Sequence, residues 1–284
     1  MNETHVVDNR TTKFLFWNVH RNVDNILRII EYSESNHIDV ITLCEAPEFQ
    51  VQNNGLYTKL EHFDLDKERQ IEVLVANDRL NTRSYFMEDY RFCTIRLECI
   101  DVNIIVVHLN SKLYEGNEEL RDVDINSIHE VVKRIEERYD SKNTIIIGDF
   151  NIGLFDRQML SMIGFNARLF RYQMGKGTST KHGVTRDLYY NPMLSLYNDA
   201  LEDYKAKGTY FYENSRIQWQ CFDHILLKKP LLERLSINSL RILSSLGDYS
   251  LIRNNRPIAT ISDHLPIYFE LMNGGCRDEI CVDY

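Results

Sequence analysis

The chain has 284 residues, of which 43% are hydrophobic and 26% are charged, with a net charge of −9 and a pI of about 5.5. This length and composition are those of an ordinary globular protein with a substantial core. The acidic balance argues against a broad basic surface for non-specific DNA binding, although a local basic groove can coexist with it. It is also compatible with a carboxylate-rich site that holds a divalent cation.

The chain begins with the polar residues MNETHVVDNRTTK, which contain no apolar signal core. The longest apolar runs are far shorter than a membrane span, and no lipid anchor is visible. We therefore expect a soluble, cytoplasmic protein that binds no membrane. The sequence indicates no protein partner.

The six cysteines do not have the spacing of a zinc site. Four of them lie in or beside apolar runs, where a free cysteine behaves as a small hydrophobic residue: Cys44, Cys93, Cys99 and Cys221. The other two, Cys276 and Cys281, lie in the tail GGCRDEICVDY and are the one candidate pair. In a cytoplasm we expect this tail to be mobile and reduced.

The chain opens with a predicted β-α-β unit. Residues 13–17 (KFLFW) form a strand that stops at Asn18, and apolar residues at helical spacing predict a helix over 24–35. Residues 39–43 (DVITL) form the next strand, and Glu45 follows its end. If the two strands are parallel neighbours, Asn18 and Glu45 emerge at the same edge of the sheet.

Three more predicted strands precede a long helix: 70–76 (QIEVLVA), 91–98 (RFCTIRLE) and 102–107 (VNIIVV). The last two are expected to pair antiparallel around a turn at Ile100 and Asp101. Apolar residues of the following helix recur on one face, at Ile128, Val131, Val132 and Ile135, with charged residues mostly on the other.

Residues 174–186 (MGKGTSTKHGVTR) are rich in Gly, Thr and Lys and have no apolar period, which predicts a loop. This is the most basic local segment, and a solvated loop explains it as well as a functional one. Further strands are predicted at 209–212, 220–227, 235–243 and 265–271. Strands and helices alternate throughout, which predicts one α/β domain over 1–284, with a frayed start at 1–12, a core at about 13–271 and a flexible polar tail after 272.

The stretch IIIGDFN, at residues 145–151, is the most informative part of the chain. Its three isoleucines predict a short buried strand, and Gly148 is expected to release the backbone into a turn. If that turn stays nearly extended, Asp149 and Asn151 lean to the same side and Phe150 points into the core. Taken alone, the stretch is also what a simple polar turn looks like.

Similar polar groups gather at other predicted strand ends, and together they comprise Asn18, Glu45, His108, Asp149, Asn151, Asp223, Asp263 and His264. Taken singly, such a glutamate is usually a cap, and such a histidine is usually a satisfied core or surface group. Asp223 is harder to dismiss, because it lies inside the apolar run CFDHILL and a buried carboxylate needs a cation, a protonated histidine or several donors. The recurrence of such polar groups at so many predicted strand ends predicts one shared site.

Three histidines stay outside this set. His20 follows Asn18 closely and is a candidate only for lining the site. His182 lies in the basic segment, where solvation explains it. His224 neighbours Asp223 on a strand, so its side chain should point to the opposite face.

The order of these residues resembles that of the endonuclease/exonuclease/phosphatase superfamily, which has the deoxyribonuclease I-like fold. The matching segments are FWNV at 16–19, TLCE at 42–45, VVHLNSK at 106–112, GDFN at 148–151, FDHIL at 222–226 and SDHLPI at 262–267. They follow the family's order with no core motif missing, and they resemble bacterial cytoplasmic members. The resemblance implies a four-layer α/β sandwich of two mixed β-sheets packed face to face and flanked by helices.

The same resemblance implies a metal-dependent phosphoric ester hydrolase that uses Mg²⁺ or Mn²⁺, ions that prefer carboxylate and carboxamide oxygens. Glu45 would be the principal metal ligand, with Asn18 beside it and Asp263 close to the ion. Arg91 is a weaker candidate for a phosphate contact, since a surface charge at a strand end explains it equally well.

The remaining motif residues would carry the hydrolytic chemistry. Asp223 would hold His264 in its tautomer, and His264 would act on the phosphate or the attacking water, as a base or as a charged donor. Asp149 would orient or deprotonate that water, and Asn151 would donate to phosphate oxygens. His108 would stabilise the pentacovalent state or protonate the leaving group.

The motifs do not choose the substrate, because this scaffold hosts nucleases, inositol-phosphate and sphingolipid phosphoesterases and other phosphatases. Aromatic residues that precede Asp223 offer stacking surfaces for bases, although strand alternation explains at least half of them: Tyr210, Phe211, Tyr212 and Trp219. Our first hypothesis is a nuclease acting on DNA or RNA. The alternative is a phosphatase or phosphodiesterase of a small or lipid-derived ester, and the remote alternative is a non-catalytic binding protein. The absence of a membrane-binding segment counts mildly against lipid substrates.

Overall fold

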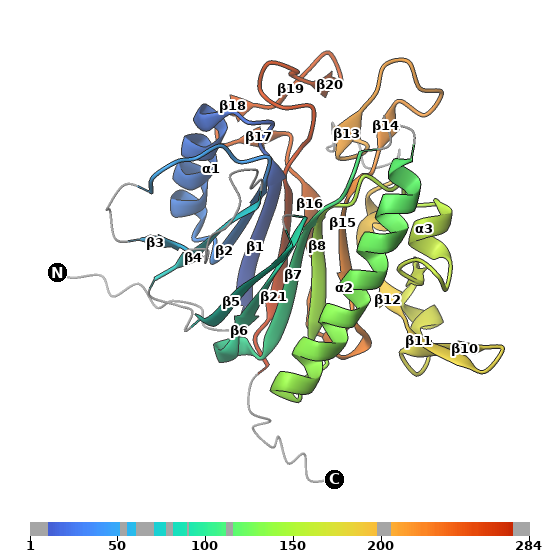
Figure 1. The fold of residues 1–284 in the computed structure, drawn as a ribbon. Helices are drawn as coiled ribbons and strands as arrows, with labels where there is room; N and C mark the ends of the chain where they lie inside the picture. The colour runs from blue at the N-terminus through green and yellow to red at the C-terminus, as the bar shows by residue number, and fades with distance from the viewer. Residues whose placement is uncertain are drawn as a thin grey trace, which may run out of the picture.

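Two mixed β-sheets pack face to face, with helices on their outer sides (Figure 1). The computed structural model describes residues 11–51, 56–60, 71–77, 82–89, 91–111, 116–197 and 206–274. Helix α1 (Val23–Asn36) lies against the six-stranded sheet, whereas α2 (Asn117–Tyr139) and α3 (Arg157–Leu160) cover the seven-stranded sheet. The expected four-layer sandwich is thereby confirmed.

The six-stranded sheet has the order β16-β21-β1-β2-β4-β3, and the seven-stranded sheet has the order β5-β6-β7-β8-β15-β12-β9. The strands of the first are β1 (Thr11–Asn18), β2 (Val40–Cys44), β3 (Tyr57–Lys59), β4 (Ile71–Ala76), β16 (Leu235–Ile242) and β21 (Ile267–Met272). Those of the second are β5 (Thr82–Asp89), β6 (Phe92–Leu97), β7 (Val102–His108), β8 (Thr144–Asp149), β9 (Ala167–Arg168), β12 (Tyr189–Tyr190) and β15 (Asp223–Leu227).

Four small hairpins stand apart from the two sheets. They are β10–β11 (Thr178–Lys181 and Val184–Asp187), β13–β14 (Tyr210–Phe211 and Trp219–Gln220), β17–β18 (Ser245–Leu246 and Tyr249–Ser250) and β19–β20 (Ile252–Arg253 and Arg256–Pro257). Single turns of 3₁₀ helix occur at Glu98–Ile100, Arg171–Met174, Pro192–Leu196 and Lys229–Leu231.

The isoleucines of β8 show how the layers hold together. Because alternate side chains of a strand point to opposite faces, Ile145 and Ile147 enter the core that includes both sheets, whereas Ile146 faces α2. There it joins Ile128 and Val132, which belong to the predicted apolar face of that helix. Burial of each such side chain contributes about 2 kcal/mol to the free energy of folding.

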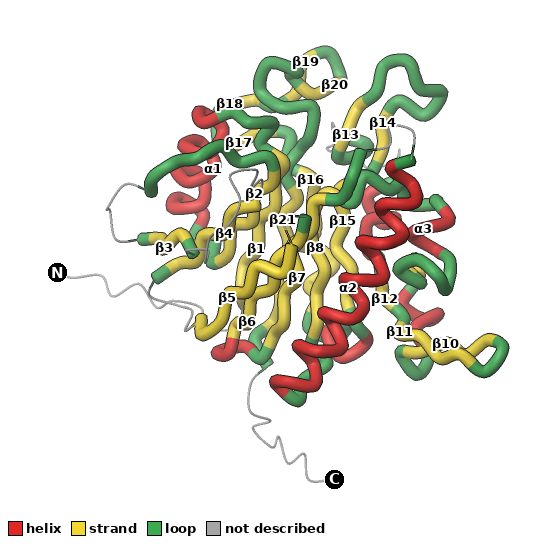
Figure 2. Tube along the Cα trace, in the orientation of Figure 1, coloured by secondary structure: helices red, strands yellow, loops and turns green. Residues whose placement is uncertain are grey.

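Most predicted elements are present, with shifted ends (Figure 2). The first strand begins at Thr11 rather than at residue 13, because Thr11 and Thr12 pair with β21. The strand predicted over 220–227 is broken, since Cys221 and Phe222 separate β14 from β15. The sequence pattern does not predict β3 or β5, whose segments lack a clear apolar alternation.

The expectation that Gly148 releases the chain into a turn is wrong. Strand β8 continues through Gly148 to Asp149, and Gly148 lies opposite Val107 of β7. A Cβ atom on Gly148 would lie 1.9 Å from the Val107 carbonyl oxygen, so the glycine permits a close approach of two backbones. The chain turns only after Asp149, where Asn151 is left-handed with φ 50°, and Phe150 is fully buried as expected.

The prediction of a loop over 174–186 is also wrong. Strands β10 and β11 pair antiparallel there. His182 and Gly183 supply the left-handed positions of a two-residue turn, with φ of 51° and 78°. Both strands are largely exposed, so no apolar alternation marks them in the sequence.

The structure also bears on the expected membrane spans and cysteine pairing. No helix among the described residues is long and apolar enough to cross a membrane. No cysteine among the described residues forms a disulfide bond, and these cysteines are Cys44, Cys93, Cys99 and Cys221. The start of the chain over 1–10 and the tail over 275–284, with Cys276 and Cys281, lie outside the described residues.

Replacing Gly148 by alanine is expected to destabilise the fold, because the added methyl group would collide with the Val107 backbone. Neither strand can move away without breaking its ladder, so we expect the free energy of unfolding to fall by about 3 kcal/mol or more in chemical denaturation. Gly183→Ala is the control. Its φ is also positive, at 78°, but nothing lies within 4 Å of the added Cβ, and it should cost about 1 kcal/mol. Equal losses would show that the close approach is unimportant.

Candidate active site

Strand ends from both sheets meet at one end of the sandwich. Parallel pairing of β1 with β2 brings Asn18 to the level of the residue that precedes Glu45. In the other sheet, pairing of β8 with β7 and with β15 places both His108 and Asp223 opposite Asp149. Asn18 Nδ2 donates to Asp149 Oδ2 at 3.1 Å, which joins the two sheets.

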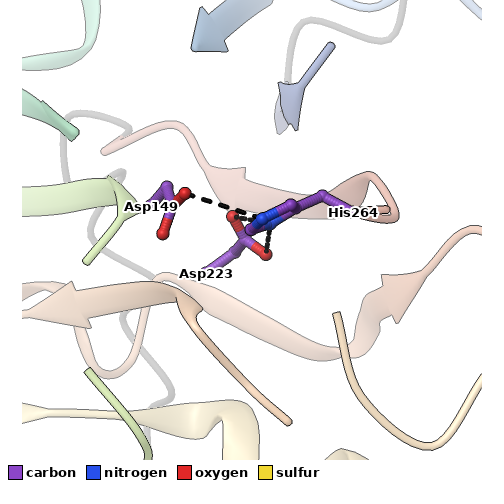
Figure 3. A group of neighbouring side chains, drawn as sticks. All are labelled: Asp149, Asp223 and His264. Carbon is purple, nitrogen blue, oxygen red and sulfur yellow. Dashed lines mark hydrogen bonds and ion pairs between the residues drawn. The ribbon is translucent and has the colours of Figure 1, made fainter. Parts of the chain in front are cut away.

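His264 lies between two buried carboxylates (Figure 3). Its Nδ1 lies 3.1 and 2.8 Å from the two oxygens of Asp223, and its Nε2 lies 3.7 Å from Asp149 Oδ2. Trp17 Nε1 donates to the His264 carbonyl oxygen at 2.9 Å, and the Asp223 N–H donates to Thr209 Oγ1 at 3.1 Å. These contacts fix the position and the ring orientation of the imidazole.

The surroundings set the charges of the two site histidines in opposite directions. Burial disfavours the imidazolium of His264, but Asp223 and Asp149 outweigh it and raise the pKa of His264 to about 10. Burial raises the pKa of Asp149 to about 6, against the opposing charge of His264. At His108, burial outweighs the attraction of Asp149 and Glu45 and lowers the pKa. At neutral pH the site therefore holds a charged His264 and a neutral His108.

Glu45 keeps coordination capacity for a ligand. Among the described residues its Oε1 accepts one hydrogen bond, from Asn18 Nδ2 at 3.2 Å, and it lies 3.8 Å from His108 Nε2. Its Oε2 lies 4.0 Å from Arg21 Nε. A carboxylate with one hydrogen bond and loose ionic neighbours can bind a further cation or donor.

Glu45, His108, Asp149 and His264 line one cavity of about 650 Å³. Four of its lining residues have left-handed backbone although they are not glycine, with φ between 48° and 54°: His20, Arg21, Glu45 and Asn151. Such conformations cost free energy and cluster at functional sites. The left-handed residues therefore cluster at the same cavity as the sequence motifs.

The oxygen ligands at this cavity fit a hard divalent cation. Asp263 Oδ1 is buried and accepts no hydrogen bond from the described residues, and His20 Nδ1 lies 3.3 Å from it. The Glu45 carboxylate and the Asn18 carboxamide supply further oxygens of the type that Mg²⁺ and Mn²⁺ prefer. The predicted metal ligands thus line or adjoin one open cavity.

A second group is close enough to hold a metal, since ligand atoms of Asp149, Asp223 and His264 lie within 4.8 Å of one another. Its geometry favours a different role. His264 Nδ1 is already engaged by Asp223, and the side chains of Asp149 and Asp223 are 2% and 0% exposed. Mg²⁺ usually keeps several waters and takes substrate phosphate as a ligand, so Glu45, with a 25% exposed side chain, is the better first ligand.

The other two predicted residues also lie in the cavity wall. Asn151 lies just beyond the end of β8. Its N–H donates to Asp149 Oδ1 at 2.9 Å, and its Nδ2 donates to the Leu109 carbonyl oxygen at 3.0 Å. Arg91 Nε lies 3.6 Å from Asp124 Oδ2, so its charge is partly neutralised. The structure therefore brings all nine predicted site residues to one place.

From the sequence, His20 is a candidate only for lining the site and Tyr210 only a stacking surface, and Arg21 is not singled out; all three line the cavity. His20 lines the cavity as that expectation allowed, and Arg21 is the next residue, so closeness in sequence to Asn18 is the signal that could have identified Arg21 as well. Tyr210 also lines it, with its ring centroid 4.8 Å from that of His264. The contact depends on Leu265 N–H donating to the Thr209 carbonyl oxygen at 2.8 Å, a tertiary pairing that no local pattern predicts.

The histidines set aside behave differently from one another. His224 points away from the site, as predicted, and is buried with Nε2 2.8 Å from the Ile152 carbonyl oxygen and Nδ1 3.1 Å from Asn191 Nδ2. His182 is exposed at the β10–β11 turn. His20 is the one that reaches the site.

No family model matches the sequence, and a search of curated proteins gives no significant match. Solved structures do match over nearly the whole chain. The 3′ phosphatase NExo from Neisseria, bound to a product DNA hairpin, has a TM-score of 0.57 at 16% identity and covers 92% of this chain and 99% of that chain. TDP2 from D. rerio, complexed with a single-strand DNA product, has a TM-score of 0.57 at 15% identity and covers 92% and 98%.

An AP endonuclease from Archaeoglobus fulgidus also matches, with a TM-score of 0.53 at 14% identity and coverage of 91% of this chain and 98% of that chain. Identities this low establish the fold alone. The deoxyribonuclease I-like fold, which the motifs implied, is therefore confirmed.

The pair of His264 and Asp223 is expected to stabilise the metal-free fold more at neutral than at high pH. On folding, the pKa of this histidine rises from about 6.5 to about 10. Its contribution to stability is therefore complete at any pH below the pKa of the unfolded state. That contribution is lost as the pH rises through the pKa of the folded state. In EDTA, the difference in melting temperature between the parent and His264→Gln should shrink from about pH 7 to about pH 10. His182→Gln, at an exposed position, is the control, and a difference that stays constant would mean that His264 is neutral in the fold.

Proposed function

We propose that this protein is a divalent-metal-dependent phosphoesterase that hydrolyses phosphodiester bonds of nucleic acid, with DNA as the first candidate. One observation carries the proposal. A charged His264, the buried Asp149 and the accessible Glu45 face a single cavity of about 650 Å³. A phosphodiester held there would have a cationic donor on one side and a metal-binding carboxylate on the other, which is what an anionic transition state requires.

Glu45, Asn18 and Asp263 would hold a Mg²⁺ or Mn²⁺ ion. When bound, the ion would polarise a phosphoryl oxygen and stabilise the charge that develops on the leaving oxygen. Asn18 has a second function, because its Nδ2 donates to both Glu45 and Asp149 and so fixes the distance between the metal ligand and the water-binding carboxylate.

His264 is the charged donor to the phosphate. Asp223 engages its Nδ1, so Nε2 is the nitrogen that faces the substrate. Because the imidazolium already carries its proton, it stabilises the extra negative charge of the pentacovalent state and does not accept a proton from water. Asp149, with an oxygen 3.7 Å from that Nε2, is placed to orient the attacking water and take its proton.

His108 and Asn151 complete the phosphate environment. His108 Nε2 lies 3.8 Å from Glu45 and 3.9 Å from Asp149, and His108 lines the same cavity, so it could donate to a phosphoryl oxygen that is bound beside these groups. Asn151 uses one Nδ2 hydrogen on the Leu109 carbonyl oxygen, and the other can donate to the phosphate. Arg91, whose charge Asp124 partly neutralises, adds a weaker attraction.

DNA is favoured over other esters by two observations. NExo and TDP2, which share this fold, were solved with DNA products. In this chain Tyr210 lines the cavity beside His264 and offers an aromatic surface to a base. A phosphatase acting on a terminal or small phosphate ester is the second candidate, because the groups described act on the phosphate alone. We also propose that the protein is cytoplasmic, where cysteines without a disulfide bond stay reduced.

The purified protein is expected to cleave DNA oligonucleotides and bis-p-nitrophenyl phosphate with Mg²⁺ or Mn²⁺, and to lose this activity in EDTA. Asp149→Ala and His264→Ala should each lower kcat by about 10² to 10⁴-fold, the usual loss when a proton-transfer or charge-stabilising group is removed. His182→Ala is the matched control and should retain parental activity, since that side chain lies at a distant exposed turn.

The choice of substrate distinguishes the candidate functions. Plasmid DNA, single-stranded RNA and a 3′-phosphorylated oligonucleotide should be compared under the same conditions. Cleavage of the generic diester alone would favour a small or lipid-derived ester. A folded protein that hydrolyses none of these substrates with either metal would contradict the proposal.

Glu45→Gln is expected to weaken metal binding, because it removes the charge of the principal ligand. The Mg²⁺ concentration for half-maximal activity should rise about 10-fold or more, and the upward shift of melting temperature that Mg²⁺ gives the parent should shrink. Glu130→Gln, on the exposed face of α2, is the control. An unchanged metal requirement would exclude Glu45 as the principal ligand.

A further inference from the structure

A second cavity, of about 420 Å³, adjoins the candidate active site, and Asp263 lines both. Its walls come from the two short hairpins β13–β14 and β19–β20, which stand beside each other at one end of the sandwich (Figure 1). We call it the hairpin cavity. Its lining residues include Phe211, Glu213, Arg253, Asn254, Arg256 and Asp263.

Strand β13 forms the partition between the two cavities. Because alternate side chains of an extended chain point to opposite sides, Tyr210 and Tyr212 line the active-site cavity whereas Phe211 and Glu213 line the hairpin cavity. The Phe211 ring is held edge-on against Trp219, with centroids 5.3 Å apart. A ligand that extends from the active-site cavity past Asp263 therefore leaves Tyr210 and Tyr212 and meets Phe211 and Glu213 in the hairpin cavity.

The β19–β20 hairpin presents two arginines at directly opposed positions. Arg253 pairs with Arg256 across the ladder, and Asn254 and Asn255 form the turn with φ of 53° and 57°. Like charges directly opposite each other destabilise a β-pair. The hairpin is nevertheless fixed at its base, where Ile252 and Pro257 are buried.

One of these two arginines is neutralised. Arg256 Nη1 lies 3.1 Å from Glu213 Oε2, and this ion pair links the two hairpins. Within the part of the chain that the structure describes, Arg253 has neither an ion pair nor a side-chain hydrogen bond. Asp263, the other carboxylate of the cavity, faces His20 at 3.3 Å. An uncompensated guanidinium thus lines a cavity that opens beside the phosphate site.

We propose that the hairpin cavity binds the nucleotide next to the scissile phosphodiester, with Arg253 on its phosphate and Phe211 on its base. This inference rests on the proposed function and narrows its substrate to a polynucleotide strand. A strand repeats its phosphates, so it needs cationic groups at more than one place, and a guanidinium matches phosphate well. An aromatic ring stacks on any base without reading its identity. In a protein with a net charge of −9, such a local cation has to supply the attraction.

Binding tests the cavity without requiring catalysis. The affinity of a fluorescent single-stranded DNA oligonucleotide should be measured by anisotropy in EDTA for the parent, Arg253→Ala and Arg253→Lys. We expect Arg253→Ala to weaken binding about 10-fold and to reduce the slope of log affinity against log salt by about 0.7, with partial recovery in Arg253→Lys. Phe211→Leu should weaken binding without changing the salt slope.

Arg216→Ala is the matched control, because this exposed arginine lies in the β13–β14 turn and lines neither cavity. It removes the same charge at a similar place and should bind as the parent does. Equal weakening by both alanine variants would overturn the proposal and leave only a diffuse effect of net charge.

Hydrolysis separates this proposal from the proposed function. Arg253→Ala should raise KM for the oligonucleotide about 10-fold and leave hydrolysis of bis-p-nitrophenyl phosphate unchanged, since that ester has no neighbouring nucleotide. A parent that cleaves both substrates, with Arg253→Ala indistinguishable from it, would overturn the hairpin cavity and keep the phosphoesterase. Arg253-dependent binding in a parent that hydrolyses nothing would keep the cavity and overturn the phosphoesterase.

Discussion

The burial of two carboxylates on adjacent strands is the constraint on which the rest of the site depends. Asp149 and Asp223 lie opposite each other on β8 and β15, with side chains 2% and 0% exposed. A buried carboxylate is costly unless it is paired and hydrogen-bonded. The compensating groups come from distant parts of the chain, since His264 precedes the last strand and Asn18 ends the first. Both belong to the other sheet's segments, so the site forms only when the two sheets pack.

The same constraint divides the site into an enclosed part and an accessible part. Asp149, Asp223 and His264 are almost fully buried, and the two carboxylates outweigh burial and raise the pKa of His264. Glu45 and Asp263 lie toward solvent, where a hydrated metal ion and a substrate can enter. In the proposed function, groups that orient water or donate to phosphate need a fixed geometry, whereas metal ligands need exchange with solvent. The left-handed backbone at several cavity-lining residues suits this second part, because it directs side chains inward from exposed turns.

The small hairpins extend this arrangement beyond the proposed phosphate site. Strand β13 separates two cavities by strand alternation alone, with Tyr210 on one side and Phe211 on the other. The ion pair between Glu213 and Arg256 links β13–β14 to β19–β20 at the surface. An exposed ion pair contributes little to stability, so its importance lies in the shape and charge that the hairpins present to a ligand.

The sequence by itself determined which residues could form the site, because strand periodicity and strand-end chemistry are local properties. All of the proposed ligands and hydrolytic groups, from Asn18 to His264, were identifiable from their places at strand ends and from the order of the motifs. Only the tertiary structure decided that Asp223 lies opposite Asp149, that Tyr210 packs on His264 and that the exposed segment 178–187 is a hairpin. Register between strands distant in sequence depends on how whole faces pack. Exposed strands such as β10 and β11 have no apolar period in the sequence, so the sequence does not predict that hairpin.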